Sequence, residues 1–418
     1  MRIFIACLAG FSAAAAFAQM GGRAAINPDH PAIQYWRRDS QDPVAELVRK
    51  LADGSAVLRA DPKFGLLPSL LEELRIPVES QILVFSKTSL QSAQIGPESP
   101  RAIYFNDSVA VGWVRDSPMI ELAAHDPEQG VVFYTVTPNV RGGPSFSRDS
   151  VCLSCHHTAS TLGAPGMLVR SIYPSVTGLA VTGLAGTATD HRTPYSERWG
   201  GWYITGRRGP LRHLANAVVG GVRGGAAAVG AVDAIREPPP ERFSIVSYPA
   251  PTSDIAALAV FEHQAHMMNL ITRIAWTSRV AVHEDPAGRG APIVDSAARE
   301  LVDYMLFIDE APLTAPIEGS SGFSEKFSAQ GPFDSKGRSL RQLDLNRRLM
   351  RYPCSYLVHS TPFQALPADA KAAVYRRLWE VLSGKETDPR YKRLSADDRR
   401  AVIEILTETI DDFPEHFR

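Results

Sequence analysis

The stretch Gly130-Val131-Val132-Phe133-Tyr134-Thr135-Val136 decides the fold class that the sequence predicts. It is a short run of β-branched and aromatic residues, which is the composition of a β-strand. Similar runs precede it at residues 81–86, 102–105, 109–114 and 119–123, and turn-forming residues separate some of them at 106–108 and 126–130. This spacing predicts an antiparallel β-rich unit that ends just before residue 148.

Directly after this unit the chain reads Val151-Cys152-Leu153-Ser154-Cys155-His156-His157. Two cysteines separated by two residues and followed at once by histidine form the C-x-x-C-H pattern of covalent c-type haem attachment. Two thiols one helical turn apart can each add to a vinyl group of the same haem, and the adjacent imidazole can bind the iron. The pattern therefore predicts one covalent haem c, with Cys152 and Cys155 as thioether anchors and His156 as the proximal iron ligand.

Cysteine pairs also occur in zinc sites and in thioredoxin-like redox sites. A zinc site needs a second pair of ligands, and the only other cysteines are Cys7 and Cys354. A thioredoxin-like pair opens a helix after a strand in a small βαβ unit. Neither alternative explains the adjoining histidine, and Cys354 is expected to be a buried, inert thiol, although a thiolate can bind haem iron.

The first 18 residues have the features of a cleavable signal peptide. A positive charge at Arg2 precedes an apolar run, and Ala16-Phe17-Ala18 provides a small-x-small cleavage site. Cys7 would leave with this peptide. Since covalent haem attachment is completed outside the cytoplasm, the signal and the haem motif support each other, and we expect a periplasmic or otherwise exported protein.

Size and charge limit the classes of partner. The chain has 418 residues, 44% of them hydrophobic, and a formal charge of −1. We see no basic stripe interleaved with aromatic residues, so no nucleic acid is expected. No later segment is both long enough and sufficiently apolar to form a stable membrane span. The nearest, at 214–235, contains Arg223, Asp233 and several glycines.

The second half of the chain has helical periodicity. Helices are expected at residues 255–282, 293–307, 371–382 and 396–410, the last with Ser395 as its N-cap. The clearest break is Glu237-Pro238-Pro239-Pro240. The predicted fold class is α+β: an antiparallel β-rich N-terminal half, a haem-binding segment, and a mainly α-helical C-terminal half. The expected units are a signal peptide (1–18), a β-rich region (19–147), a haem-attachment region (148–236) and a helical region (241–418).

The haem motif makes the chain resemble the c-type cytochromes over residues 148–157. Three further stretches resemble those of large exported bacterial monohaem cytochrome proteins, mostly of unknown function. They are Ser80-Gln81-Ile82-Leu83-Val84-Phe85-Ser86-Lys87-Thr88-Ser89, Arg198-Trp199-Gly200-Gly201-Trp202-Tyr203 and Tyr352-Pro353-Cys354-Ser355-Tyr356-Leu357. This resemblance implies a covalent haem, but it does not indicate any established reaction.

The sixth iron ligand separates the functions that remain open. The candidates, in order of preference, are His263, His191, Met167 and His213. A second strong ligand suits outer-sphere electron transfer, whereas an open position allows small molecules to bind. The stretch 198–206 has tryptophans and glycines that could lie against a planar cofactor, or it could be a core strand with a bulge. Arg207, Arg208 and Arg212 could pair with haem propionates or form a solvated cluster.

Two functions are compatible with these features. The first is an exported monohaem cytochrome that transfers single electrons to or from a redox partner protein or a small-molecule donor or acceptor. The alternative is a haem-dependent redox enzyme, peroxidase-like or oxygenase-like, or a haem sensor, with an open distal site. The alternative rests on size, because one haem needs only about 100 residues to enclose it.

Overall fold

The computed structural model describes residues 25–417 except 140–142, 185, 220–246 and 287–289. The predicted signal peptide and the proline-rich break lie outside the described residues. Within them, the N-terminal half contains a seven-stranded antiparallel sheet of order β6-β5-β4-β3-β2-β1-β9. Its strands are β1 (Ile82–Val84), β2 (Arg101–Phe105), β3 (Val109–Trp113), β4 (Ile120–Asp126), β5 (Gly130–Thr137), β6 (Ser145–Arg148) and β9 (Trp202–Tyr203).

The turn residues that separate the apolar runs close the hairpins of this sheet. Between β2 and β3 the side chain of Asn106 accepts hydrogen bonds from the amides of Ser108 and Val109. Such a bond mimics a backbone turn and explains why asparagine stands there. It sets the register in which Phe105 pairs with Ala110.

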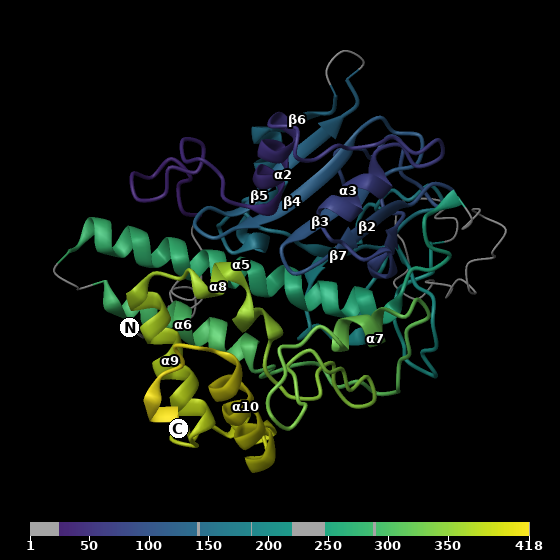
Figure 1. Ribbon diagram of the computed structural model, residues 1–418. Coiled ribbons are helices and arrows are strands. Elements are labelled where there is room, and N and C mark those ends of the chain that lie inside the picture. Colours follow the sequence, from purple (N-terminus) through teal and green to yellow (C-terminus); the bar gives the residue numbers. More distant parts are fainter. Residues whose placement is uncertain (1–24, 140–142, 185, 220–246, 287–289, 418) are drawn as a thin grey trace, which may run out of the picture.

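Helices cover both faces of the sheet (Figure 1). On one face α2 (Pro43–Ala52) and α3 (Leu67–Glu73) pack against residues such as Tyr104 and Val111. On the other face the long helix α5 (Ile255–Glu284) packs against residues such as Phe105 and Phe133. Burial on both sides explains why the strands are continuous apolar runs rather than alternating ones.

The C-terminal half is helical, so the predicted α+β class is confirmed. The cap at Asp254, whose carboxylate accepts bonds from the amides of Ala256 and Ala257, starts α5. The predicted N-cap Ser395 is also present, in a reciprocal capping box with Asp398. The helices after α5 are α6 (Ala291–Met305), α7 (Phe323–Ser328), α8 (Thr361–Gln364), α9 (Ala368–Leu382) and α10 (Ala396–Thr409).

No helix in the described part of the chain combines the length and the apolar character that crossing a bilayer requires. The expected absence of a stable membrane span agrees with this finding over those residues.

Two short β-structures follow the cysteine motif. A small two-stranded sheet forms from β7 (Val169–Ser171) and β8 (Thr187–Thr189). Strand β9 then adds to the edge of the main sheet, with Trp202 opposite Val84 in β1. Met167, Leu168, Arg170 and Trp202 thereby lie beside the cysteine motif.

Candidate functional site

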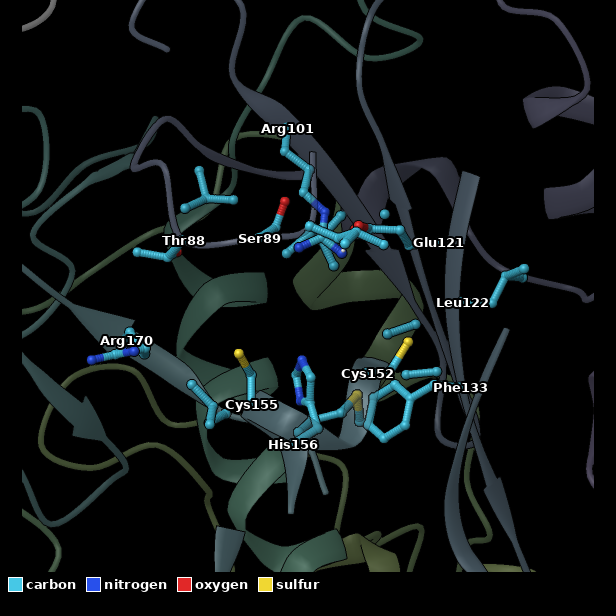
Figure 2. A pocket seen from close by; sticks show the side chains of 18 of the residues that line it. Thr88, Ser89, Arg101, Glu121, Leu122, Phe133, Cys152, Cys155, His156 and Arg170 are labelled. Atoms are coloured by element: carbon cyan, nitrogen blue, oxygen red, sulfur yellow. Dashed lines mark ion pairs between the residues drawn. The ribbon is translucent and has the colours of Figure 1, made fainter. Parts of the chain in front are cut away.

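The cysteine motif borders a cavity on the face of the sheet that α5 also covers (Figure 2). The cavity has a volume of about 300 Å³, at the lower end of the range of small-molecule sites, about 300–1,000 Å³. Cys152, Cys155 and His156 all line it. Much of the remaining wall is apolar, and it includes Val84, Ile103, Ala110, Ala123, Phe133, Leu168, Trp202 and Phe261. An apolar chamber bordered by two thiols and an imidazole fits a covalently attached haem.

A short helical turn positions the motif. Strand β6 ends at Arg148, and the carboxylate of Asp149 then accepts a bond from the amide of Val151. A 3₁₀ turn (Ser150–Cys152) leads into the one-turn helix α4 (Leu153–His156). Positions three apart lie on the same side of a helical turn. Cys152 and Cys155 are both free thiols, the second of them exposed, and both side chains point toward the cavity in Figure 2.

The ring of His156 is oriented by a backbone carbonyl. Its Nδ1 lies 2.8 Å from the carbonyl oxygen of Gly166, and because that oxygen can only accept, Nδ1 must carry the proton. Burial lowers the pKa of His156, and the nearby positive charge of Arg101 lowers it further, against the bond to Gly166. The ring is therefore neutral near pH 7, with an unprotonated Nε2. This is the arrangement found in metal-binding histidines, whose other ring nitrogen donates to a fixed acceptor.

Helix α5 holds the carbonyl that orients His156. The side chain of Asn269 accepts a bond from the amide of Met167 at 3.0 Å and donates one to the carbonyl of the same residue at 2.7 Å. A Cβ atom on Gly166 would lie 2.1 Å from Oδ1 of Asn269. Glycine is required at this position because the amide side chain occupies the space that a larger residue would need.

An ion pair forms the wall opposite His156. Nη2 of Arg101, on β2, lies 2.6 Å from Oε2 of Glu121, on β4. Figure 2 shows both side chains across the cavity from the imidazole. Neither residue was among the site residues expected from the sequence. A charged residue such as Glu121 in an otherwise apolar run is unusual, but the sequence does not indicate which residue it pairs with.

The four candidates for the sixth iron ligand lie in different places. Met167 lines the cavity and directly follows Gly166, whose carbonyl oxygen bonds His156. His191, His213 and His263 are not among the residues that line this cavity. His213 instead packs against Trp199, with the ring centroids 5.9 Å apart.

His191 and His263 come together, but away from the cysteine motif. Their Nδ1 atoms are 2.8 Å apart, and Nε2 of His263 contacts the hydroxyl of Ser355 at 2.8 Å. Both imidazoles stack with Tyr304 and Phe307. Burial lowers the pKa of both histidines, to about 3 for His263. Together they form a neutral part of the core between α5 and α6.

Other residues that the sequence singled out divide between the cavity and the core. Trp202 lines the cavity, whereas Trp199 is fully buried beside Tyr195. Cys354 is buried, and burial raises the pKa of its thiol, which fits the inert role expected. Arg207, Arg208 and Arg212 are not among the lining residues of the cavity. Arg207 pairs with Glu318 on the surface.

The alternative metal site gains no support from the described residues. Among them there is no group of three or more His, Cys, Asp or Glu side chains arranged to hold a metal ion. In that part of the chain the two motif cysteines therefore lack the companions that a tetrahedral zinc site requires. Haem needs only the two thiols and one axial nitrogen from this segment.

Comparisons with protein families, with curated proteins and with solved structures found no match. What this chain does must therefore be inferred from its own residues and their geometry.

Proposed function

We propose that this chain is an exported monohaem c-type cytochrome that transfers single electrons. Cys152 and Cys155 would hold one haem c by thioether bonds, and His156 would be its proximal ligand. One observation carries the proposal: the three side chains open on a single cavity, and the bond from His156 Nδ1 to Gly166 leaves Nε2 free to bind iron. The haem supplies the redox couple, and the protein sets its orientation and its surroundings.

The mouth of the cavity suits electron exchange with a partner protein. Cys155 and Ser154 are exposed, and they line the cavity. The two apolar lining residues Val151 and Leu90 are 45% and 55% exposed. Exposed apolar residues beside a partly open site favour close approach of a redox partner.

A haem enzyme or sensor with an open distal site is the second candidate. The specific observation is that the described residues lining the cavity include no histidine other than His156. The wall opposite His156 carries Arg101 and Glu121 instead. Neither is a usual strong ligand of haem iron, so an exchangeable sixth position follows from this wall.

Intact-mass spectrometry tests the haem directly. The full chain is produced in a bacterial host that exports it and carries out c-type haem maturation. We expect the processed mass plus one haem, and a covalent haem that acid-acetone does not extract. The variant C152A/C155A should carry no covalent haem, and the matched control Cys354→Ala should carry one. A bare polypeptide from the unaltered chain would refute the proposal.

Electron paramagnetic resonance of the ferric protein separates the two candidates. A low-spin signal with two strong axial ligands supports electron transfer alone. A high-spin signal, or rapid binding of cyanide, supports an open site. Cell fractionation tests export, which we expect to place the mature protein in the periplasm.

A further inference from the structure

Arg101 and Glu121 form a pair that spans three neighbouring strands of the sheet. Arg101 lies on β2 and Glu121 on β4, and between them Gly112 of β3 pairs in register with Glu121. A Cβ atom on Gly112 would lie 2.2 Å from Nη2 of Arg101. The guanidinium can therefore cross the middle strand only because that position is glycine. The fold holds this cation flat against the sheet, facing the cavity.

The pair is largely removed from water but incompletely bonded. The Arg101 and Glu121 side chains are 21% and 14% exposed. Arg101 Nε and Glu121 Oε2 are buried atoms that have no well-aligned hydrogen bond partner among the described residues. A guanidinium offers five N–H donors in a fixed fork, and a buried one left with spare donors is costly. The exposed part of the Arg101 side chain can donate to a ligand in the cavity that accepts hydrogen bonds.

The Arg101 side chain lines the cavity on the side that faces the imidazole of His156. Figure 2 shows Arg101 and Glu121 on one side and His156 with the two cysteines on the other. Arg101 and His156 both line this cavity. A small ligand bound in the cavity opposite His156 would therefore lie next to a positive, hydrogen-bond-donating group.

We propose that Arg101 binds small inorganic anions on the distal side of the haem, with Glu121 as the residue that positions its guanidinium. This inference rests on the proposed haem, and it specifies the ligand class of the open site. Fluoride, cyanide and the peroxide anion share the two required properties, a negative charge and a hydrogen-bond-accepting atom. Imidazole, a neutral ligand, has no use for the charge and would not be favoured by it.

The test uses the haem-loaded full chain and optical titration of the ferric protein with fluoride and with cyanide. Charge-assisted hydrogen bonds contribute about 1.5–3 kcal/mol, so Arg101→Gln should weaken fluoride binding about 10- to 100-fold. Imidazole affinity should change by less than about threefold, since the lost interaction is one that requires charge. The control Arg207→Gln removes an exposed arginine that is not among the residues lining the cavity, and should leave fluoride affinity within about twofold.

A second variant guards against misfolding. Arg101→Gln alone leaves Glu121 without its partner, whereas R101Q/E121Q removes both charges and keeps similar shapes. We expect the same loss of fluoride affinity in the double variant. Infrared spectroscopy of the ferrous carbon monoxide complex gives an independent signature, because a nearby guanidinium lowers the C–O stretching frequency and its removal should raise it.

Three outcomes would overturn the inference while leaving the covalent haem intact. They are equal fluoride affinity in the unaltered chain and in both variants, a haem that binds neither anion, and a changed reduction potential with unchanged anion affinity. The last would mean that Arg101 pairs with a haem propionate instead. A chain that carries no haem at all would refute the proposed function, and its mass would show this before any titration.

Discussion

Replacing Asn269 with alanine should both destabilise the fold and disturb His156. Asn269 satisfies the amide and the carbonyl of Met167, both in the buried core. Each buried backbone group left without a partner costs about 1–3 kcal/mol. A polar cavity of about 350 Å³, lined by Met167, Asn269, Asp190 and His266, lies alongside and can admit water. The two groups together would cost about 2–6 kcal/mol, and partial hydration places the loss in the lower part of that range, about 2–4 kcal/mol.

The same change should affect the proposed haem, because Gly166 precedes Met167 and its carbonyl accepts the bond from His156 Nδ1. Without the side chain of Asn269, the amide of Met167, which belongs to the same peptide unit as that carbonyl, loses its hydrogen bond. The imidazole should then sample more than one orientation, and the paramagnetic resonance lines of the ferric protein should broaden.

The assay is urea unfolding, with the free energy of unfolding taken from the transition midpoint and slope. The chain offers a matched control in Asn216, whose side chain bonds the amide and the carbonyl of Ile204 in the same pattern. Asn216→Ala should lose comparable stability without broadening the haem signal. A loss below about 0.5 kcal/mol for Asn269→Ala, the range of neutral surface changes, would refute the reasoning. So would identical haem spectra in the two variants.

Three further predictions follow from other parts of the molecule. Cys155→Ser should leave the haem attached by one thioether, and the absorption bands of its pyridine complex should move to longer wavelength; unchanged bands would show that Cys155 is no anchor. Glu262→Gln should lower the free energy of unfolding by about 3–5 kcal/mol, because it leaves the guanidinium of Arg198 buried without the carboxylate that lies 2.9 Å away. The control Glu318→Gln breaks an exposed ion pair and should cost less than about 1 kcal/mol in the same urea assay. Burial lowers the pKa of His125 to about 3 and of His359 to about 4, so the unfolded chain binds protons that the folded chain does not once the pH falls below about 6.5. The free energy of unfolding should keep its full value above about pH 6.5 and decline toward pH 4. His125→Gln should make this decline less steep. A urea midpoint that stays constant from pH 7 to 4 would contradict the assignment.

Local sequence was sufficient for the class of fold and for the centre of the proposed site. The run at residues 130–136 became β5, and the helical periodicities after residue 254 became α5, α6, α9 and α10. These elements follow from side-chain period and turn chemistry within a few residues. The motif at 152–156 needed no fold either, because covalent attachment requires only neighbouring thiols and an imidazole.

The wall opposite His156 could be found only in the tertiary structure. Arg101, Gly112 and Glu121 stand on three different strands, and no local pattern connects them. Sequence proximity also favoured other arginines for contact with the haem, yet Arg207 turns outward to Glu318. His191 and His263 were attractive as ligands by type and by helical placement, yet strand and helix packing directs them into the core beside Tyr304.

The amino-acid sequence by itself determined which segments become strands and helices and where the two reactive thiols and their histidine stand, since each of these depends on neighbours along the chain. Only the tertiary structure decided what faces them. The register of three strands and the path of α5 bring together residues that are far apart in the sequence. Long-range packing of this kind produces no periodic pattern along the sequence.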